Sequence, residues 1–254
     1  MERQLTHTPI TTHITLPNLH FFGFRSVSAY LEAVVCRITT PHPQTLKIRL
    51  FEQLTFSIPH LPQFMNTTEN LWFETARIEF KDREIFVEMS PFFVKVDCRH
   101  LDRQVSSVAQ ISNALSQGFS TVEHLTLEHE VHSQSSEEHN DVDRIEWRNL
   151  HRSFSNVKTL HIDNGLAEEL ARCLRLEDGE LPLELLPELQ ELTYFGSSDT
   201  GDAFTPFIDA RKYVGRPVTL VRHIPSPSPS SLSFELEPPV IPPPSDEAGN
   251  DIKT

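Results

Sequence analysis

Residues 122–127 read Val-Glu-His-Leu-Thr-Leu, and the spacing of their apolar side chains decides the expected fold. The same spacing returns at residues 19–24, 157–162 and 189–194. Apolar and polar residues alternate at the end of each motif, as is typical of a strand with one buried face. We therefore expect a strand at each of these four places.

Weaker strand patterns lie around residues 46–50, 78–80, 94–98 and 218–221. The step from Ile78 to Val94 is shorter than the other steps between expected strands. This short step predicts an extra strand near residues 85–89 instead of a full repeating unit.

Apolar residues at helical spacing lie between several of these strands. The expected helix stripes are Leu31, Val34, Val35 and Ile38; Val105, Val108 and Ile111; Leu166, Leu170, Cys173 and Leu174; and Phe204, Phe207 and Ile208 after Pro206 in a first turn. Each helix can bury one side against a layer of strands. An alternation of parallel strands and helices follows.

The predicted fold class is α/β, as an irregular leucine-rich-repeat-like solenoid with parallel strands on the concave side and helices on the convex side. Its units are longer than the roughly 20–29 residues of leucine-rich repeats. A doubly wound sheet is the alternative, although that fold usually has a Gly-rich turn after its first strand. The turn expected here contains only Gly23.

Three regions are expected: a polar lead at 1–13, the solenoid at 14–223 and a tail at 224–254. The tail is rich in Pro and Ser, a composition typical of an extended, disordered segment. Residues 133–141 are rich in Ser, Glu and His and are expected to form an exposed loop.

The chain has 254 residues and a formal net charge of −14. This charge argues against nucleic acid as a partner, because binding to phosphates requires a basic surface. Apolar runs fall short of the roughly 20 residues that span a membrane, and the N-terminus lacks a secretory signal pattern. Cys36, Cys98 and Cys173 are expected to be buried and reduced, in the cytoplasm or the nucleus.

The sequence predicts no enzyme activity, no cofactor and no metal site. Gly-x-Ser-x-Gly and phosphate-binding glycine motifs are absent from the sequence. A His-rich segment offers the best metal candidates, which are His124, Glu128, His129, Glu130, His132 and His139. This segment lacks the His-Glu-x-x-His pattern and runs from a strand into a polar loop, so incidental histidines are the preferred interpretation.

A binding surface is expected on the concave side, where side chains alternate away from the core. The motif phase assigns to it Lys47, Arg49, Glu79, Lys95, Asp97, Thr126, His161 and Thr193, with Gly23 beside them and Arg25, Glu128, Asp163 and Phe195 at the rim. Basic residues come from the N-terminal strands and acidic residues from the middle ones. A protein ligand suits this mixture of charges better than a polyanion does.

Several short segments of the chain also resemble a known protein family. The most specific is Leu-Glu-Leu-Leu-Pro-Glu-Leu-Gln-Glu-Leu-Thr-Tyr at 183–194, and others lie at 14–24, 63–68, 207–211 and 215–221. Together they resemble the C-terminal leucine-rich-repeat-like half of F-box proteins of mushroom-forming (basidiomycete) fungi. Members of that family begin with an F-box, which docks on the adaptor of a cullin-type ubiquitin ligase. We expect no F-box in residues 1–13.

The leading functional hypothesis is a non-enzymatic protein-interaction module that binds an unknown protein. By resemblance, this protein would be a ubiquitin-ligase substrate, and a cullin-ligase adaptor would be a partner only with an F-box supplied elsewhere. A truncated F-box protein fragment without an independent function is one alternative. A zinc-dependent enzyme built on the His124–His139 segment is the other.

Overall fold

The structure is a computed structural model that describes residues 12–40, 44–66, 73–130, 141–176, 181, 183–195 and 198–223. The strands are β1 (Ile14–Thr15), β2 (Phe21–Ser26), β3 (Ile38–Thr39), β4 (Thr45–Leu50), β5 (Thr75–Lys81), β6 (Glu84–Met89), β7 (Phe92–Asp97), β8 (His124–Glu130), β9 (Thr159–Ile162), β10 (Glu191–Phe195) and β11 (Thr219–His223). The helices are α1 (Ser28–Val35), α2 (Leu61–Asn66), α3 (Leu101–Ala114), α4 (Ser116–Phe119), α5 (Asp141–Arg152), α6 (Asn164–Leu174), α7 (Ser198–Ala203) and α8 (Thr205–Tyr213).

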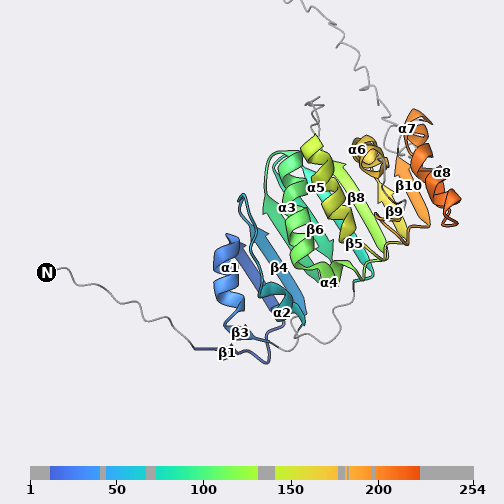
Figure 1. The fold of residues 1–254 in the computed structure, drawn as a ribbon. Helices are drawn as coiled ribbons and strands as arrows, with labels where there is room; N and C mark the ends of the chain where they lie inside the picture. Colours follow the sequence, from blue (N-terminus) through green and yellow to red (C-terminus); the bar gives the residue numbers. More distant parts are fainter. Residues whose placement is uncertain are drawn as a thin grey trace, which may run out of the picture. The chain divides into compact units, whose positions relative to one another are not determined.

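Nine strands form one mostly parallel sheet in the order β11-β10-β9-β8-β5-β6-β7-β4-β2, drawn in Figure 1. Strands β1 and β3 form a separate parallel pair. The predicted α/β class is confirmed, and so is the extra strand near residues 85–89, which is β6. Most strands of the sheet pair in parallel as expected, and the extra strand β6 departs from this arrangement, because it is antiparallel to both β5 and β7.

The lengths of the connections explain this reversal. Asp82 and Arg83 alone join β5 to β6, and Ser90 and Pro91 alone join β6 to β7. A parallel crossover needs about a dozen residues, whereas a two-residue link allows only a hairpin. The β5–β7 meander therefore folds back, so that β4 pairs with β7 and not with β5.

One face of the sheet is buried and the other is open. Along β5, Ala76, Ile78 and Phe80 are buried, and the residues between them are exposed to varying degrees. The same alternation runs through β4, β6 and β7. The labelled helices gather on one side of the sheet (Figure 1). On each of these strands, every second side chain therefore faces the helices and belongs to the core.

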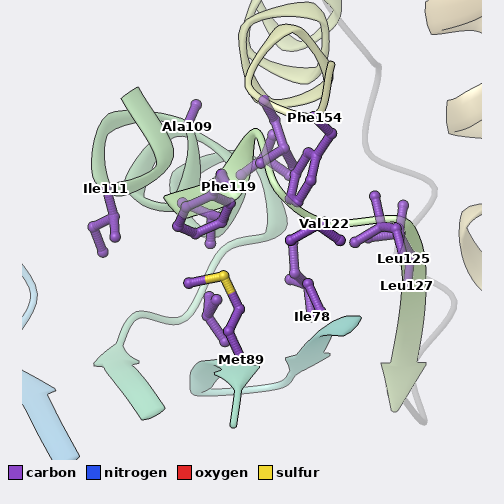
Figure 2. Close-up of a cluster of buried hydrophobic side chains, with 14 of the residues drawn as sticks. Ile78, Met89, Ala109, Ile111, Phe119, Val122, Leu125, Leu127 and Phe154 are labelled. Carbon is purple, nitrogen blue, oxygen red and sulfur yellow. The ribbon is translucent and has the colours of Figure 1, made fainter. Parts of the chain in front are cut away.

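Figure 2 shows part of this core, where Ile78 and Met89 from the strands face Phe119 and Phe154 from the helical layer. The rings of Phe119 and Phe154 meet edge to face with their centroids 5.2 Å apart. Both rings are fully buried. The interior is therefore a close-packed apolar layer between the strands and the helices.

The predicted helices agree with the structure in part. Helices α3, α6 and α8 bury the expected stripes, and Pro206 lies in the first turn of α8. Helix α1 ends at Val35, and Ile38, expected on its stripe, instead belongs to β3 and pairs with Ile14. Helices α2, α4, α5 and α7 were not expected. The signal for α5 was its own stripe of Trp147, Leu150 and the following Phe154.

The cysteines differ from one another in burial. Cys98 and Cys173 are 2% and 1% exposed, as predicted, whereas Cys36 is exposed where α1 ends. Most of the predicted polar lead, the loop at 133–141 apart from residue 141, and the tail lie outside the described residues. None of the helices in the described ranges is long and apolar enough to cross a membrane.

Arg211 of α8 is fully buried and holds a loop together. Its guanidinium donates hydrogen bonds to the carbonyl oxygens of Leu186 (3.2 Å), Pro187 (2.9 Å), Leu189 (3.0 Å) and Arg216 (3.3 Å). Leu186 has a positive φ of 49°. The five donors of one planar group therefore fix the irregular chain that leads into β10.

We expect the substitution Arg211→Met to lower the free energy of unfolding by about 3 kcal/mol, because it leaves buried carbonyl groups without donors. Arg211→Lys should also destabilise, since one ammonium group cannot reach all four oxygens. Urea denaturation followed by circular dichroism measures both. The control is Arg216→Met, which removes an exposed guanidinium while keeping the Arg216 carbonyl. Equal stability of the Arg211 and Arg216 variants would contradict this role.

His151 of α5 is also buried. Its Nδ1 donates a hydrogen bond to the carbonyl oxygen of Trp147 at 2.7 Å, and its Nε2 has no hydrogen-bond partner among the described residues. Burial lowers the pKa of His151 to about 4. The folded protein therefore holds this imidazole neutral at pH 7.

Stability should consequently fall as the pH falls. An unfolded His has a pKa of about 6.5. Between pH 6.5 and about 4, His151 is therefore protonated in the unfolded chain but stays neutral in the folded chain. Above pH 6.5, burial of the neutral His151 does not reduce the free energy of unfolding. As the pH falls from 7 to 5, the free energy of unfolding should decrease by about 2 kcal/mol. Urea midpoints of the wild type and His151→Phe, measured across this range, test the difference. Parallel pH profiles would show that His151 does not contribute.

Candidate functional site

The open face of the sheet, defined as the side chains of β2 and β4–β11 that point away from the helices, carries the residues predicted for binding. Strand pairing brings their positions into rows across the sheet. Lys47 lies between Gly23 and Phe93, and Arg49 lies between Arg25 and Lys95. The phase of alternation on each strand was therefore sufficient to select this face.

The predicted positions occupy the face in three groups. Lys47, Arg49, Lys95 and Asp97 lie on β4 and β7; Glu79, Thr126 and Glu128 lie on β5 and β8; His161, Asp163 and Thr193 lie on or just after β9 and on β10. Thr193 departs from the expectation of solvent exposure, since it is only 4% exposed. Its hydroxyl donates to Oε1 of Glu191 at 3.2 Å.

Ion pairs link neighbouring strands on this face. Nε of Arg49 donates to both carboxylate oxygens of Asp97 at 3.1 Å, which joins β4 to β7. Arg77 and Glu128 join β5 to β8 at 2.5 Å. The Asp97 and Glu128 carboxylates raise the pKa values of Arg49 and Arg77 by hydrogen bonding to their guanidinium groups.

Two lysines of the open face are also paired with carboxylates. Lys81 Nζ lies 3.0 Å from Glu79 and 2.7 Å from Glu130, and Lys95 pairs with Glu84. Hydrogen bonds to Glu130 and Glu79 raise the pKa of Lys81. Many charges of the open face therefore neutralise one another.

Aromatic rings also lie on the open face, and sequence reasoning missed those of Phe21, Phe86 and Phe93, although it expected Phe195 at the rim. Lys47 Nζ lies 5.9 Å from the ring centre of Phe21 and 5.6 Å from that of Phe93. Lys95 and Lys81 approach the ring of Phe86 at 4.6 and 5.2 Å. The signal was present, because Phe86 and Phe93 alternate with buried neighbours. An apolar residue in a strand is easily assigned to the core, however.

The described residues of this face line two hollows that adjoin each other. The first, of about 530 Å³ and here called the basic-aromatic hollow, is lined by Gly23, Phe24, Arg25, Lys47, Ile48, Arg49, Glu79, Phe86, Val87, Glu88, Phe93, Val94 and Lys95. The second, of about 380 Å³ and here called the acidic hollow, is lined by Glu79, Thr126, Leu127, Glu128, His129, Glu130, His161, Ile162, Asp163 and Phe195. They share Glu79. One end of the face thus offers cations and aromatic rings, and the middle offers carboxylates.

The candidate metal ligands within the described residues, which are His124, Glu128, His129 and Glu130, form no group that could hold a metal ion. His124 lies on the open-face phase of β8, where its Nδ1 is 2.6 Å from Thr159 Oγ1. His129 has the opposite phase and lies against α6, since a Cβ on Gly165 would come within 2.6 Å of its Nδ1. Burial lowers the pKa of His129. His132 and His139 lie outside the described residues, within which no group of three or more His, Cys, Asp or Glu could hold a metal ion.

Comparison of the chain with protein-family models, with curated proteins and with solved structures finds no match.

Open-face and core positions of one strand should respond differently to truncation. We expect Glu79→Ala to change the free energy of unfolding by about 1 kcal/mol or less, because its ion pair with Lys81 is partly exposed. Ile78→Ala, at the adjacent buried position, should cost about 3 kcal/mol because it leaves a cavity. Chemical denaturation of both variants measures the contrast. A loss at Glu79 as large as that at Ile78 would show that the open face is structural.

Proposed function

We propose that this chain is a non-enzymatic protein-interaction module whose open sheet face binds another protein. The observation that carries the proposal is the open face itself, with its charges of both signs, its aromatic rings and its two adjoining hollows. The described helices cover the opposite face (Figure 1). A broad surface of this composition suits a protein partner.

The dimensions of the face agree with this choice. Nine strands with neighbours about 4.8 Å apart extend over about 38 Å, and strands of four to seven residues cover about 18 Å on average. The product, roughly 700 Å², approaches the roughly 800 Å² that each partner buries in a protein complex of standard size. The net charge of −14 and the internal ion pairs disfavour a polyanion.

Our interpretation of the architecture is an irregular leucine-rich-repeat-like solenoid, with the open face as its concave side. Strands β8, β9, β10 and β11 support it, since they follow one another in the sheet in chain order and pair in parallel. Each successive pair is connected by helix-containing chain. The β5–β7 meander is the irregular part.

The resemblance to fungal F-box proteins supplies a narrower proposal. The bound protein would be a substrate presented to a cullin-type ubiquitin ligase in the cytoplasm or the nucleus. Contact with the ligase adaptor would require an F-box supplied elsewhere. This step rests on the resemblance, and the binding role rests on the open face.

Affinity capture with a charge-reversed open face tests the binding role. The tagged full chain is expressed in a mushroom-forming fungus as the wild type, as Glu79→Arg and as Glu168→Arg, and captured proteins are quantified by mass spectrometry. Glu79 is common to both hollows, whereas Glu168 is an exposed residue of α6. We expect a partner that is lost with Glu79→Arg and kept with Glu168→Arg, because only the former changes the open face.

The captured partner must then bind the purified chain directly, with the same dependence on Glu79, in isothermal titration calorimetry. Equal binding by both variants would contradict the assignment of the open face. The same captures test the ligase proposal. Cullin and adaptor subunits should accompany the wild type, and their clean absence would remove the ligase role while leaving the binding role.

A further inference from the structure

The basic-aromatic hollow differs from the rest of the open face in how its charges are satisfied. Arg49 and Lys95, which line it, are paired with Asp97 and Glu84. Arg25 and Lys47 also line it, and no carboxylate of the described residues lies within 4 Å of either one. Two cations therefore remain available there, on a chain whose net charge is −14.

Both available cations lie beside aromatic rings. The guanidinium carbon of Arg25 is 5.6 Å from the ring centre of Phe51, and Lys47 lies near both Phe21 and Phe93. Phe21 is 54% exposed. Rings hold the cations in place but leave their hydrogen-bond donors free for an acceptor from outside.

Gly23 shapes the hollow between these groups. A Cβ at this position would lie 2.8 Å from Cε1 of Phe21, so the absence of a side chain allows the ring to lie against the strand. Gly23 lines the hollow, so the Phe21 ring that lies over it stands at the edge of the hollow, next to Lys47.

We propose that the basic-aromatic hollow binds an acidic peptide segment of the partner protein, with a carboxylate at Arg25 and Lys47 and a neighbouring apolar side chain against Phe21 and Phe93. The proposal rests on the proposed function, because it names the chemistry of the ligand for the same face. Carboxylates satisfy the available donors, and the exposed rings offer an apolar side chain a surface to cover. The hollow, of about 530 Å³, has room for two or three such side chains.

Selection from phage-displayed random 12-residue peptides tests the proposal without a known partner. The bait is the immobilised full chain at physiological salt. Enriched peptides should carry Asp or Glu beside an apolar residue. The strongest of them is then synthesised with a fluorescent label, and its affinity for purified variants is measured by fluorescence polarisation.

Three variants distinguish the hollow from general charge effects. Lys47→Glu should weaken binding at least about tenfold, because it replaces attraction of the carboxylate by repulsion. Gly23→Leu should weaken it similarly without a change of charge, because the new side chain would displace the Phe21 ring from its place at the edge of the hollow. Lys212→Glu, with the same change of charge at an exposed position of α8, should alter the affinity less than about twofold. Thermal melts confirm that each variant is folded.

The outcomes separate this inference from the proposed function. Enrichment of basic peptides, failure to enrich any peptide, or equal binding by Lys47→Glu and Lys212→Glu would overturn the inference. The proposed function would survive each of these results if capture of the partner still depends on Glu79. If that dependence is also absent, both fail.

Discussion

One-sided burial of a nine-stranded sheet is the constraint on which the rest of the structure depends. Strands β4 to β9 each have a neighbouring strand on both sides, so their backbones are paired within the sheet. Their apolar side chains can be buried only in the layer between the sheet and the helices, so alternate side chains must point into that layer. The opposite phase is then left for solvent. The core and the open face are therefore two consequences of one alternation, and a shift of register by one residue would exchange them.

The β5–β7 meander shows how connection length shapes the binding surface. Two short links reverse β6, and this reversal places Phe86 opposite Lys95 on one side and Glu79 on the other. The same register sets Glu84 across from Asp97 and Lys81, where Lys95 can reach it. The charges and rings in the middle of the open face thus come from a departure from the simple strand-and-helix repeat.

Local periodicity predicted most of the strands and the face on which the candidate residues lie, because both depend on alternation within a few residues. It did not predict that β4 pairs with β7, since pairing depends on distant segments. Phe21, Phe86 and Phe93 were missed because hydrophobicity alone cannot tell a core ring from one on an exposed face. Thr193 was correctly placed on the open face but wrongly expected to be exposed to solvent. Alternation along a strand predicts the face on which a side chain lies, and it does not predict whether neighbouring side chains cover it.

Polar groups serve different roles on the two sides of the sheet. On the helix side, Arg211 has its donors bound to carbonyl groups, and His151 is held neutral, so these groups are committed to the fold. On the open face, exposed ion pairs such as Arg77–Glu128 contribute little net stability and hold each other in place. Arg25 and Lys47 differ from these paired groups, since no carboxylate of the described residues lies within 4 Å of either one. Their donors can therefore bind an incoming anion, whereas the carboxylates that line the acidic hollow attract a cation.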